Sequence, residues 1–398
     1  MELKKYKLEE CCLHITDGEH GSVNDDLQGD YYLLSNKNVI NGNIVISKDD
    51  RKINKATFDK INKRILLEEK DVIISTVGTL GKTAIIEGNI NYTFQRSVGI
   101  IKPNPQIIDS HYLKYLLDTD YYQQLLIGLS VGAVQKCIFI GTLKSLPISI
   151  PSLPTQKKIA NILQALDQKI ALNRQINDNL EAMAKQLYDY WFVQFDFPND
   201  EGRPYKSFGG KMVYNPKLKR QIPEGWECAS LGLFSEVKRG TTITKTQTVE
   251  GNIKVVAAAT TFSFLHNEAN RSEYVITISA SGANAGCINF WREPIYASDC
   301  STIQCDKVEK TLYCYYWIKH FQEMLYNQQI GAAQPHVYPE HINKISIVVP
   351  PQQLLDKISP LLVSINEQQK ELNIEIENLT QQRDELLPLL MNGQVSVD

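Results

Sequence analysis

The sequence predicts an α+β fold in which two mixed α/β globular units are joined by two long coiled-coil helices. Three observations indicate this fold: a short motif occurs twice, a strand pattern follows each copy, and a heptad pattern follows each strand. All three recur at an offset of about 199 residues in a chain of 398. The common offset predicts an internal repeat with pseudo-twofold organisation.

The repeated motif is GAVQK at residues 132–136 and GAAQP at residues 331–335. After the first copy comes LKSLPISIP, which ends at Pro151, and after the second comes INKISIVVP, which ends at Pro350. Apolar residues that alternate before a proline are typical of a half-buried strand that stops there. We therefore expect each globular unit to close with a similar strand.

Past each proline, apolar residues recur at steps of four and three, which is the heptad pattern of helices that pack along a seam. The expected seam residues are Ile159, Leu163, Leu166, Ile170, Leu180 and Leu187 in the first helix, and Ile358, Leu362, Ile365, Leu372, Ile376, Leu379 and Leu386 in the second. Their shared length and register favour packing of the helices on each other. The alternative, in which each helix packs on its own globular unit, stays open.

Polar residues interrupt both seams, at Asn173 and Asn177 in the first helix and at Gln369 and Arg383 in the second. Such residues lower stability but can fix the register and the partner of a helix. Ser359 followed by Pro360 has the residue types of an N-cap and a first helical position. We therefore expect the regular part of the second helix to begin there.

The globular units share a strand, a Gly-rich turn and a second strand, DVIISTVGTLGKTAII at 71–86 and YVITISASGANAGCINFW at 274–291. A further strand-like run and an aromatic helical run follow in each. The expected boundaries are a first globular unit at 1–151, a first spacer helix at 152–191, a linker at 192–222, a second globular unit at 223–350, and a second spacer helix with a C-terminal tail at 351–398.

Composition narrows the class of protein. The formal net charge is −3 and 43% of residues are hydrophobic, so the chain has enough apolar residues for real cores and has no strongly basic arm. Its eight cysteines lack metal-ligand spacing, which predicts reduced thiols in a cytoplasmic protein and no metal site. No signal-peptide pattern is present, and no apolar run reaches the roughly 18 residues of a membrane span.

Catalytic motifs are also missing from the sequence. GTLGKT at 78–83 resembles a phosphate-binding loop, but that loop needs Gly where Thr76 stands, so a hairpin turn is the better interpretation. We find no HExxH or strand-linked GxGxxG motif, and no Asn/Asp-Pro-Pro-aromatic signature of adenine methyltransferases. The chain is therefore expected to recognise or organise other molecules and not to be an enzyme.

A family resemblance follows from the central region. The run YWFVQFDFPNDEGRPYKSFGGKMVYNPKLKRQIPEGW resembles the central region of specificity subunits of type I restriction–modification systems. The helix IANILQALDQKIALNRQINDNLE resembles their first spacer helix, and RDELLPLLMNGQV at 383–395 resembles the end of their second. The resemblance implies a host-defence protein with two target recognition domains, each reading one half of an asymmetric bipartite DNA site.

The same resemblance implies partners and cofactors. Double-stranded DNA and two modification subunits would bind this chain, and restriction subunits would join them, with no membrane involved. S-adenosylmethionine, ATP and Mg would be held by those partner subunits, and this chain would hold no cofactor. The two long helices would pair antiparallel as a coiled coil, set the gap between the half-sites and bind the modification subunits.

Candidate DNA-binding residues carry side chains that can bond base edges or phosphates and belong to expected loops or strand ends. They are Thr79, Lys82, Gln95, Arg96, Gln135 and Lys136 in the first unit, and Lys238, Arg239, Asn284, Arg292, Gln334 and His336 in the second. Of these, Lys238 and Arg239 are expected to contact phosphates. For the equivalent pair Gln135 and Gln334, capping of a turn is an equally open alternative, and solvated surface is an alternative for the rest.

Two further expectations follow. DNA affinity comes largely from neutralised phosphates, so a chain with almost no net charge should bind DNA weakly without its partners. The globular units diverge more than the helices, which predicts two unlike half-sites. A coiled-coil scaffold without DNA recognition, a DNA-modifying enzyme, and a specificity chain of a related restriction enzyme of another type remain as alternatives.

Overall fold

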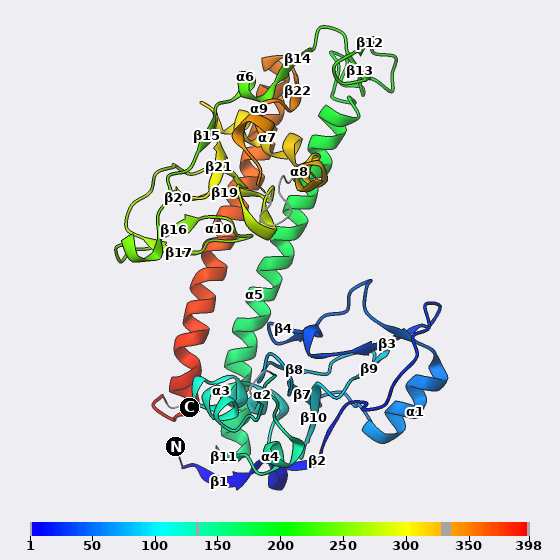
Figure 1. Ribbon diagram of the computed structural model, residues 1–398, viewed down its shortest axis with the longest axis vertical. Coiled ribbons are helices and arrows are strands. Elements are labelled where there is room, and N and C mark those ends of the chain that lie inside the picture. The colour runs from blue at the N-terminus through cyan, green and yellow to red at the C-terminus, as the bar shows by residue number, and fades with distance from the viewer. Residues whose placement is uncertain (1, 133–134, 328–335, 396–398) are drawn as a thin grey trace. The chain divides into compact units, whose positions relative to one another are not determined.

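The computed structural model describes residues 2–132, 135–327 and 336–395. It divides into two compact units, one of Met1–Ala171 with Glu377–Asp398 and the other of Leu172–Ile376. We call them unit 1 and unit 2. Two long helices, α5 (Leu153–Tyr188) and α10 (Gln352–Met391), each contribute a segment to both units (Figure 1).

Unit 1 contains eleven strands and four shorter α-helices within the residues described. The strands are β1 (Lys4–Lys7), β2 (Cys12–Asp17), β3 (Tyr31–Leu34), β4 (Val39–Ile40), β5 (Asn43–Ile44), β6 (Lys52–Ile53), β7 (Val72–Ser75), β8 (Thr83–Ile85), β9 (Tyr92–Phe94), β10 (Val98–Pro103) and β11 (Pro147–Ile150). The helices are α1 (Lys55–Ile65), α2 (Ser110–Asp118), α3 (Asp120–Gly128) and α4 (Ile140–Lys144).

Unit 2 follows the same plan after a short hairpin. Its strands are β12 (Met212–Asn215), β13 (Arg220–Pro223), β14 (Glu227–Ser230), β15 (Val237–Arg239), β16 (Ile253–Val256), β17 (Phe264–His266), β18 (Val275–Ser279), β19 (Ile288–Trp291), β20 (Ile295–Ala297), β21 (Cys300–Ile303) and β22 (Ser346–Val349). Its shorter helices are α6 (Leu231–Phe234), α7 (Val308–Lys319), α8 (Gln322–Asn327) and α9 (Pro339–Asn343).

Sheet topology repeats between the units. Unit 1 has a four-stranded sheet of order β2-β10-β7-β8, and unit 2 has one of order β15-β21-β18-β19. A three-stranded sheet accompanies each, β6-β3-β9 and β17-β16-β20, in which the second and third strands run parallel. The two globular parts therefore share one order of strands in each of these sheets.

The closing strands lie where the alternating patterns predict them. β11 pairs antiparallel with β1, and β22 pairs antiparallel with β14. In each unit the last strand of the globular part therefore pairs with its first, and the proline at position 151 or 350 follows directly. Because the chain then enters a long helix, this pairing fixes the point at which each helix leaves the sheet.

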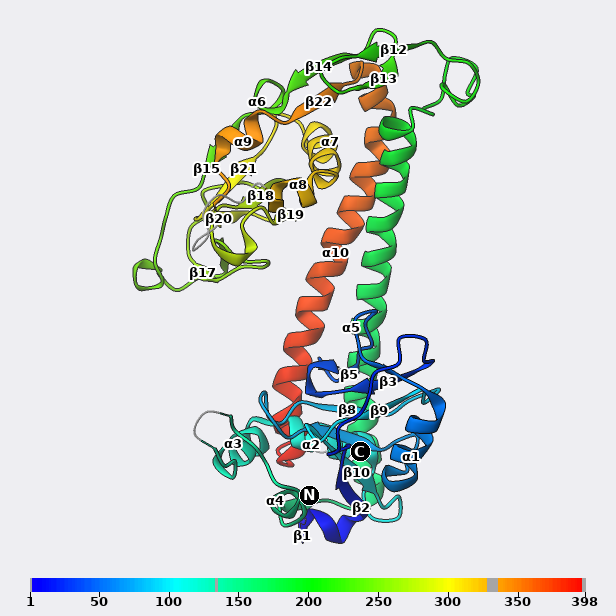
Figure 2. The same cartoon turned by 45° about the vertical axis from the view of Figure 1, so that its right-hand side comes forward.

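Each hydrophobic core includes segments of both long helices. In unit 1, Ile159 and Leu163 of α5 and Leu390 of α10 are buried in one cluster with α2. In unit 2, Ile358 and Leu362 of α10 are buried with Tyr188 of α5 and the aromatic helix α7. The unit 2 segments of the two helices lie side by side in both views (Figure 1 and Figure 2). The helices thus pack on the globular parts as well as near each other.

The expected seam residues are all at least half-buried. Ile159, Leu163, Ile170, Ile358, Leu362 and Ile365 are buried, and Leu166, Leu180, Leu187, Leu372, Ile376, Leu379 and Leu386 are half-buried. Polar side chains at the expected interruptions bond between the helices. Arg383 donates to Asp167 at 2.9 Å in unit 1, and in unit 2 Asn177 donates to Asn373 at 2.5 Å and Asn173 to Glu375 at 2.9 Å.

One boundary expectation is wrong. α10 begins at Gln352, so Ser359 and Pro360 lie inside the helix and do not start it. The Ser359 hydroxyl donates to the carbonyl of Leu355, four residues earlier, and so caps nothing. A proline inside a helix costs about 3 kcal/mol or more. Burial of Ile358 and Leu362 on either side offsets that cost, because both side chains need the helical spacing to reach the core.

The structure also bears on the cysteines and on membrane spans. All eight cysteines are free thiols. In the part of the chain that the structure describes, no helix has both the length and the apolar character needed to cross a membrane.

Replacing Leu163 by Ala should lower the free energy of unfolding by about 2–5 kcal/mol, because the side chain is fully buried where α5 joins the core of unit 1. Urea unfolding followed by circular dichroism measures this difference. Leu172→Ala on the same helix is the matched control, since Leu172 is 55% exposed, and it should change stability by less than about 0.5 kcal/mol. Equal losses in the two variants would contradict this packing.

Candidate nucleic-acid interface

Four loops of unit 1 meet at one end of the strands of its four-stranded sheet. The β7–β8 turn is bonded to the segment that leads into α4, since Ile138 N–H donates to Thr76 O at 2.8 Å and Gly78 N–H to Lys136 O at 3.2 Å. Val77 and Cys137 also form a β-bridge. The turn that carries Thr79 and the segment that carries Lys136 therefore form one surface.

The other two loops join the same end through backbone bonds. Thr76 N–H donates to Ser97 O at 2.9 Å, and Arg96 N–H donates to Glu19 O at 3.0 Å. We call the combined surface, residues 18–22, 76–82, 95–97 and the described part of 131–138, the loop edge of unit 1. It gathers loops that lie more than a hundred residues apart in the sequence.

All six candidates from the first unit lie on this loop edge. Thr79, Lys82, Arg96, Gln135 and Lys136 are exposed, and Gln95 is half-buried. Exposed lysine and arginine side chains can neutralise phosphates, and arginine and glutamine can each make paired hydrogen bonds to a base edge. The loop edge thus has the side-chain chemistry of a nucleic-acid surface. The individual DNA contacts remain predictions.

A polar cavity of about 440 Å³ opens beside Gln95 and Arg96. Its lining is Glu19, His20, Gly21, Ser22, Val23, Leu33, Arg51, Gln95 and Arg96. Arg51 is held in place because its guanidinium donates to Val23 O and to Asp25 Oδ1, both at 2.6 Å. These two bonds fix the Arg51 side chain in the wall of the cavity.

A buried carboxylate steadies the segment before Arg51. The Asp50 side chain is 2% exposed and accepts bonds from Ser47 N–H and Asn38 Nδ2, both at 2.7 Å, and from Lys37 Nζ at 2.8 Å. Burial alone would raise the pKa of Asp50, but the bonds from Lys37, Ser47 and Asn38 together hold it below its ordinary value. The carboxylate therefore stays ionised at neutral pH and keeps these bonds.

The β18–β19 turn of unit 2 is closed by the same backbone bonds as the β7–β8 turn of unit 1. Gly81 N–H donates to Ser75 O at 2.9 Å, and Gly286 N–H donates to Ser279 O at 2.8 Å. The return bonds also correspond, from Ser75 N–H to Lys82 O at 2.8 Å and from Ser279 N–H to Cys287 O at 3.0 Å. The frame is repeated, whereas the enclosed residues differ, with TVGTL in the first turn and ASGANA, one residue longer, in the second.

Candidates of the second unit are more scattered. His336 forms a β-bridge with Ser281 and so lies beside the β18–β19 turn that carries the half-buried Asn284. Lys238 and Arg239 are exposed on β15, where Lys238 forms an ion pair with Glu236 at 2.8 Å. Gln334 lies outside the described residues, and its equivalence with Gln135 stays a prediction.

Arg292 occupies a different environment from the other candidates. Its side chain is 13% exposed and donates to Asn366 Oδ1 at 2.9 Å and to Gln369 Oε1 at 2.5 Å, both on α10. It also lies 3.5 Å from the carboxylate of Glu181 on α5. These contacts give Arg292 a structural role that fastens the end of β19 to both long helices. DNA contact by Arg292 remains a prediction without support from this geometry.

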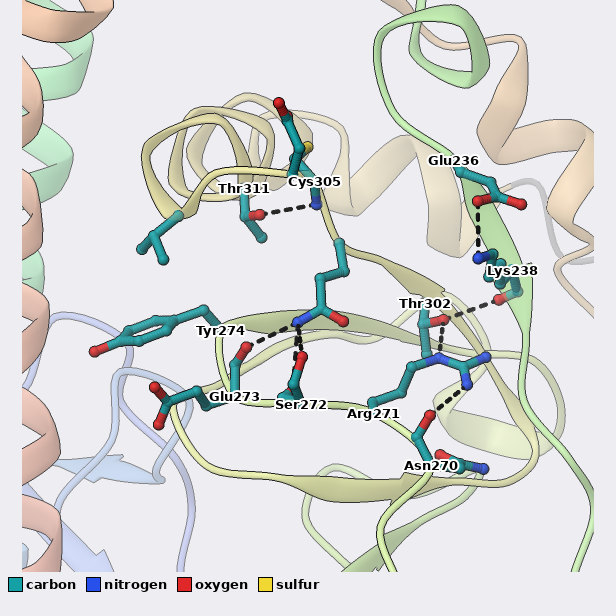
Figure 3. Close-up of a pocket in the computed structure, with 13 residues that line it drawn as sticks. Glu236, Lys238, Asn270, Arg271, Ser272, Glu273, Tyr274, Thr302, Cys305 and Thr311 are labelled. Carbon is teal, nitrogen blue, oxygen red and sulfur yellow. Dashed lines mark hydrogen bonds and ion pairs between the residues drawn. The ribbon is translucent and has the colours of Figure 1, made fainter.

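A larger cavity of unit 2, about 770 Å³, adjoins β15 and β21. Figure 3 shows Arg271 within it, bonded to Thr302 and Asn270. The guanidinium donates to Thr302 Oγ1 at 2.9 Å, to Asn270 O at 2.7 Å and to Arg239 O at 3.1 Å. Arg271 therefore fixes β15 against β21 and directs its donors to protein acceptors.

Known proteins resemble this chain along most of its length. The family described as type I restriction modification DNA specificity domain matches residues 16–182 and 223–378, more than half of the chain. This chain belongs to that family. Each matched stretch contains the turn frame described above and at least three whole strands of the four-stranded sheet that carries it.

Individual relatives agree with the family. The type I restriction enzyme MjaIX specificity subunit of Methanocaldococcus jannaschii is 26% identical over 384 residues, which cover 89% of this chain and 84% of the relative. The HindI specificity subunit of Haemophilus influenzae is 23% identical over 390 residues, covering 79% and 84%. The solved S subunit from M. genitalium has a TM-score of 0.63 at 17% identity, covers 98% of this chain and 96% of its own, and shows a shared fold.

Sequence patterns alone do not reveal two glycines of this specificity-domain chain. A Cβ on Gly18 would lie 2.2 Å from Gln95 O, and a Cβ on Gly240 would lie 2.2 Å from Ser298 O. Each glycine directly follows the outer strand of its four-stranded sheet, β2 or β15. In the sequence, the only sign of this role is that each glycine directly follows a strand. The close approach itself depends on backbone atoms of Gln95 and Ser298, which lie far from these glycines in the sequence.

Gly18→Ala should lower the free energy of unfolding by about 1–3 kcal/mol or more, because the new methyl group meets rigid backbone at the loop edge. Thermal or urea unfolding of the purified chain measures it. Gly128→Ala at the end of α3 is the control, since no atom lies within 4 Å of its added Cβ, and it should be neutral or slightly stabilising. An unchanged stability of the Gly18 variant would exclude the close approach.

Proposed function

We propose that this chain is the DNA specificity subunit of a type I restriction–modification complex. Each globular unit would be a target recognition domain that reads one half of an asymmetric bipartite DNA site. The observation that carries the proposal is the repeated turn frame with unlike tips, on a chain that belongs to the specificity-domain family. A shared frame holds both tips in the same way, and different tip residues can then read different bases.

The two long helices would form an antiparallel coiled coil that sets the gap between the half-sites. Within unit 2, bonds between the two helices support this direction, because the residue number falls along α10 as it rises along α5: Asn173 bonds Glu375, Asn177 bonds Asn373, and Glu181 bonds Gln369. The 36 residues of α5 span about 54 Å at about 1.5 Å per residue. Half-sites one helical turn apart lie about 34–36 Å from each other, which is of the same order.

Partner subunits would supply the catalytic chemistry of the complex. We propose that two modification subunits bind the spacer helices and bring S-adenosylmethionine for N6-adenine methylation. Restriction subunits would bring ATP and Mg, and this chain would be a cytoplasmic, non-catalytic component. Leu172, Ile176 and Met183 support a helix-binding surface, because they follow each other on one face of α5 and are 38–55% exposed.

Two alternatives make different predictions. A coiled-coil scaffold without DNA recognition would bind proteins through the same helices but would leave DNA methylation unchanged. A specificity chain of a related restriction enzyme of another type would recognise DNA through the same domains but would act in a different set of subunits. Family membership favours the type I assignment over both.

Expression of this chain with its modification subunit in a methylation-free host should produce N6-methyladenine in a single motif of two unlike half-sites with a fixed gap. Genome-wide mapping of the modified base measures it. Exchange of residues 1–151 for another recognition domain should then change one half-site only. A soluble complex that adds no methylation would leave the scaffold alternative and contradict the proposal.

Arg96→Ala and Lys238→Ala should affect DNA binding in different ways. Loss of a base-reading arginine should cost about 1–3 kcal/mol at one base position and relax specificity there, whereas loss of a phosphate contact should weaken all sequences alike and reduce the salt slope by about 1. Anisotropy titrations of the assembled complex, with cognate and mismatched duplexes at several salt concentrations, separate these effects. Lys157→Ala removes one exposed charge from α5 as a control, and base discrimination should not change in it.

A further inference from the structure

Two glutamines bond to corresponding residues of the β7–β8 turn and the β18–β19 turn, which we call the recognition turns. Gln123 of α3 donates through Nε2 to the carbonyl of Gly81 at 2.9 Å. Gln322 of α8 donates through Nε2 to the carbonyl of Gly286 at 2.6 Å. The two residues are separated by the same 199 positions as the repeated motif. Both glutamines lie in the aromatic helical runs that the two units share, whereas the accepting residues Gly81 and Gly286 are 205 positions apart.

The accepting glycines hold equivalent positions in the turn frame. Each donates its N–H back to the last residue of the incoming strand, Ser75 or Ser279. Each has a left-handed backbone conformation, with φ of +78° at Gly81 and +86° at Gly286. Glycine adopts this conformation without steric strain, which suits it to a tight turn. The glutamine amide donates a hydrogen bond to the glycine carbonyl and so fixes the orientation of the peptide that closes the turn.

Further bonds make each glutamine a rigid link. Gln123 Nε2 also donates to Leu117 O at 2.7 Å, which ties the turn to the end of α2. Gln322 Oε1 accepts from Ile288 N–H at 3.0 Å, which ties the side chain to the first residue of β19. Both side chains are half-buried. Each turn is thus held by the backbone bonds between its two strands and by a side-chain bond from a neighbouring helix.

The tips that these links hold carry the candidate DNA-binding residues. In unit 1 the turn carries Thr79 and Lys82, and in unit 2 it carries Asn284. The tip residues differ between the units, whereas the glutamine and the glycine carbonyl are the same. The part of the turn that would contact bases varies, and the part that would aim it does not.

We propose that Gln123 and Gln322 are positioning residues for DNA recognition, each of which aims one recognition turn at its half-site without touching DNA. This inference rests on the proposed function. Donor and acceptor positions must match a base edge closely for a paired hydrogen bond to form. A turn that loses its support from behind would therefore lose discrimination at its own half-site and leave the other half-site unchanged.

The test uses the complex of the full chain with its modification subunit, and maps N6-methyladenine in a methylation-free host. Gln123→Met and Gln322→Met keep the side-chain length but remove the donor, and Gln123→Glu and Gln322→Glu keep a polar side chain that can no longer donate when ionised. Gln124→Met is the matched control, because Gln124 is the exposed neighbour on the same helix. The exchange of residues 1–151 assigns each half-site to its unit.

We expect the Gln123 variants to relax the first half-site only and the Gln322 variants to relax the second only. The preference for the cognate half over one-base mismatches should fall about tenfold, which corresponds to about 1.4 kcal/mol. That figure lies within the cost of about 1–3 kcal/mol for one mismatched base pair. The Gln124 variant should keep the wild-type motif.

Opposing results separate the two proposals. A wild-type complex that methylates no bipartite motif would overturn the proposed function and, with it, this inference. A wild-type motif that persists in all four variants, or a uniform fall in methylation at every site without a change of motif, would overturn the inference alone. In the second case the glutamines would stabilise the fold without aiming the turns.

Discussion

Each globular part builds its hydrophobic core around segments of both long helices, and the rest of the structure depends on this constraint. Ile159 and Leu390 are buried together with α2 in unit 1, and Tyr188 and Ile358 are buried together with α7 in unit 2. Burial of a large apolar side chain contributes about 1.5–3 kcal/mol, so several of them fix a helix firmly. A helix that is part of a core cannot change its angle without disturbing that core.

Polar bonds add directionality to this apolar attachment. In unit 1, the Tyr115 hydroxyl donates to Asp167 at 2.6 Å, and Arg383 donates to the other oxygen of the same carboxylate. In unit 2, Arg292 bonds side chains of α10 and lies near Glu181 of α5. Apolar contacts tolerate small slips along a helix, whereas a half-buried charge that loses its partner is costly. These clusters therefore favour one register of each globular part on its helices.

On this fixed base, the loops divide into a repeated frame and variable tips. Backbone bonds at Ser75 and Gly81 recur at Ser279 and Gly286, and they do not depend on which side chains the tip carries. A frame made of backbone bonds tolerates sequence change at its tip, because the side chains are not needed to close it. The arrangement suits a protein in which the scaffold stays constant while the bound sequence changes.

The sequence alone determined the repeat, the closing strands β11 and β22, the two long helices and the burial of seam residues such as Leu163 and Leu362. These features follow from local periodicity, in which neighbours three, four or two positions apart share one face. Only the tertiary structure decided that Arg96 meets Glu19, that Gln123 reaches Gly81, that Arg292 faces α10 and that α10 starts before Pro360. Those outcomes depend on contacts between residues distant in sequence, or on packing strong enough to override a local signal, and neither leaves a periodic trace in the chain.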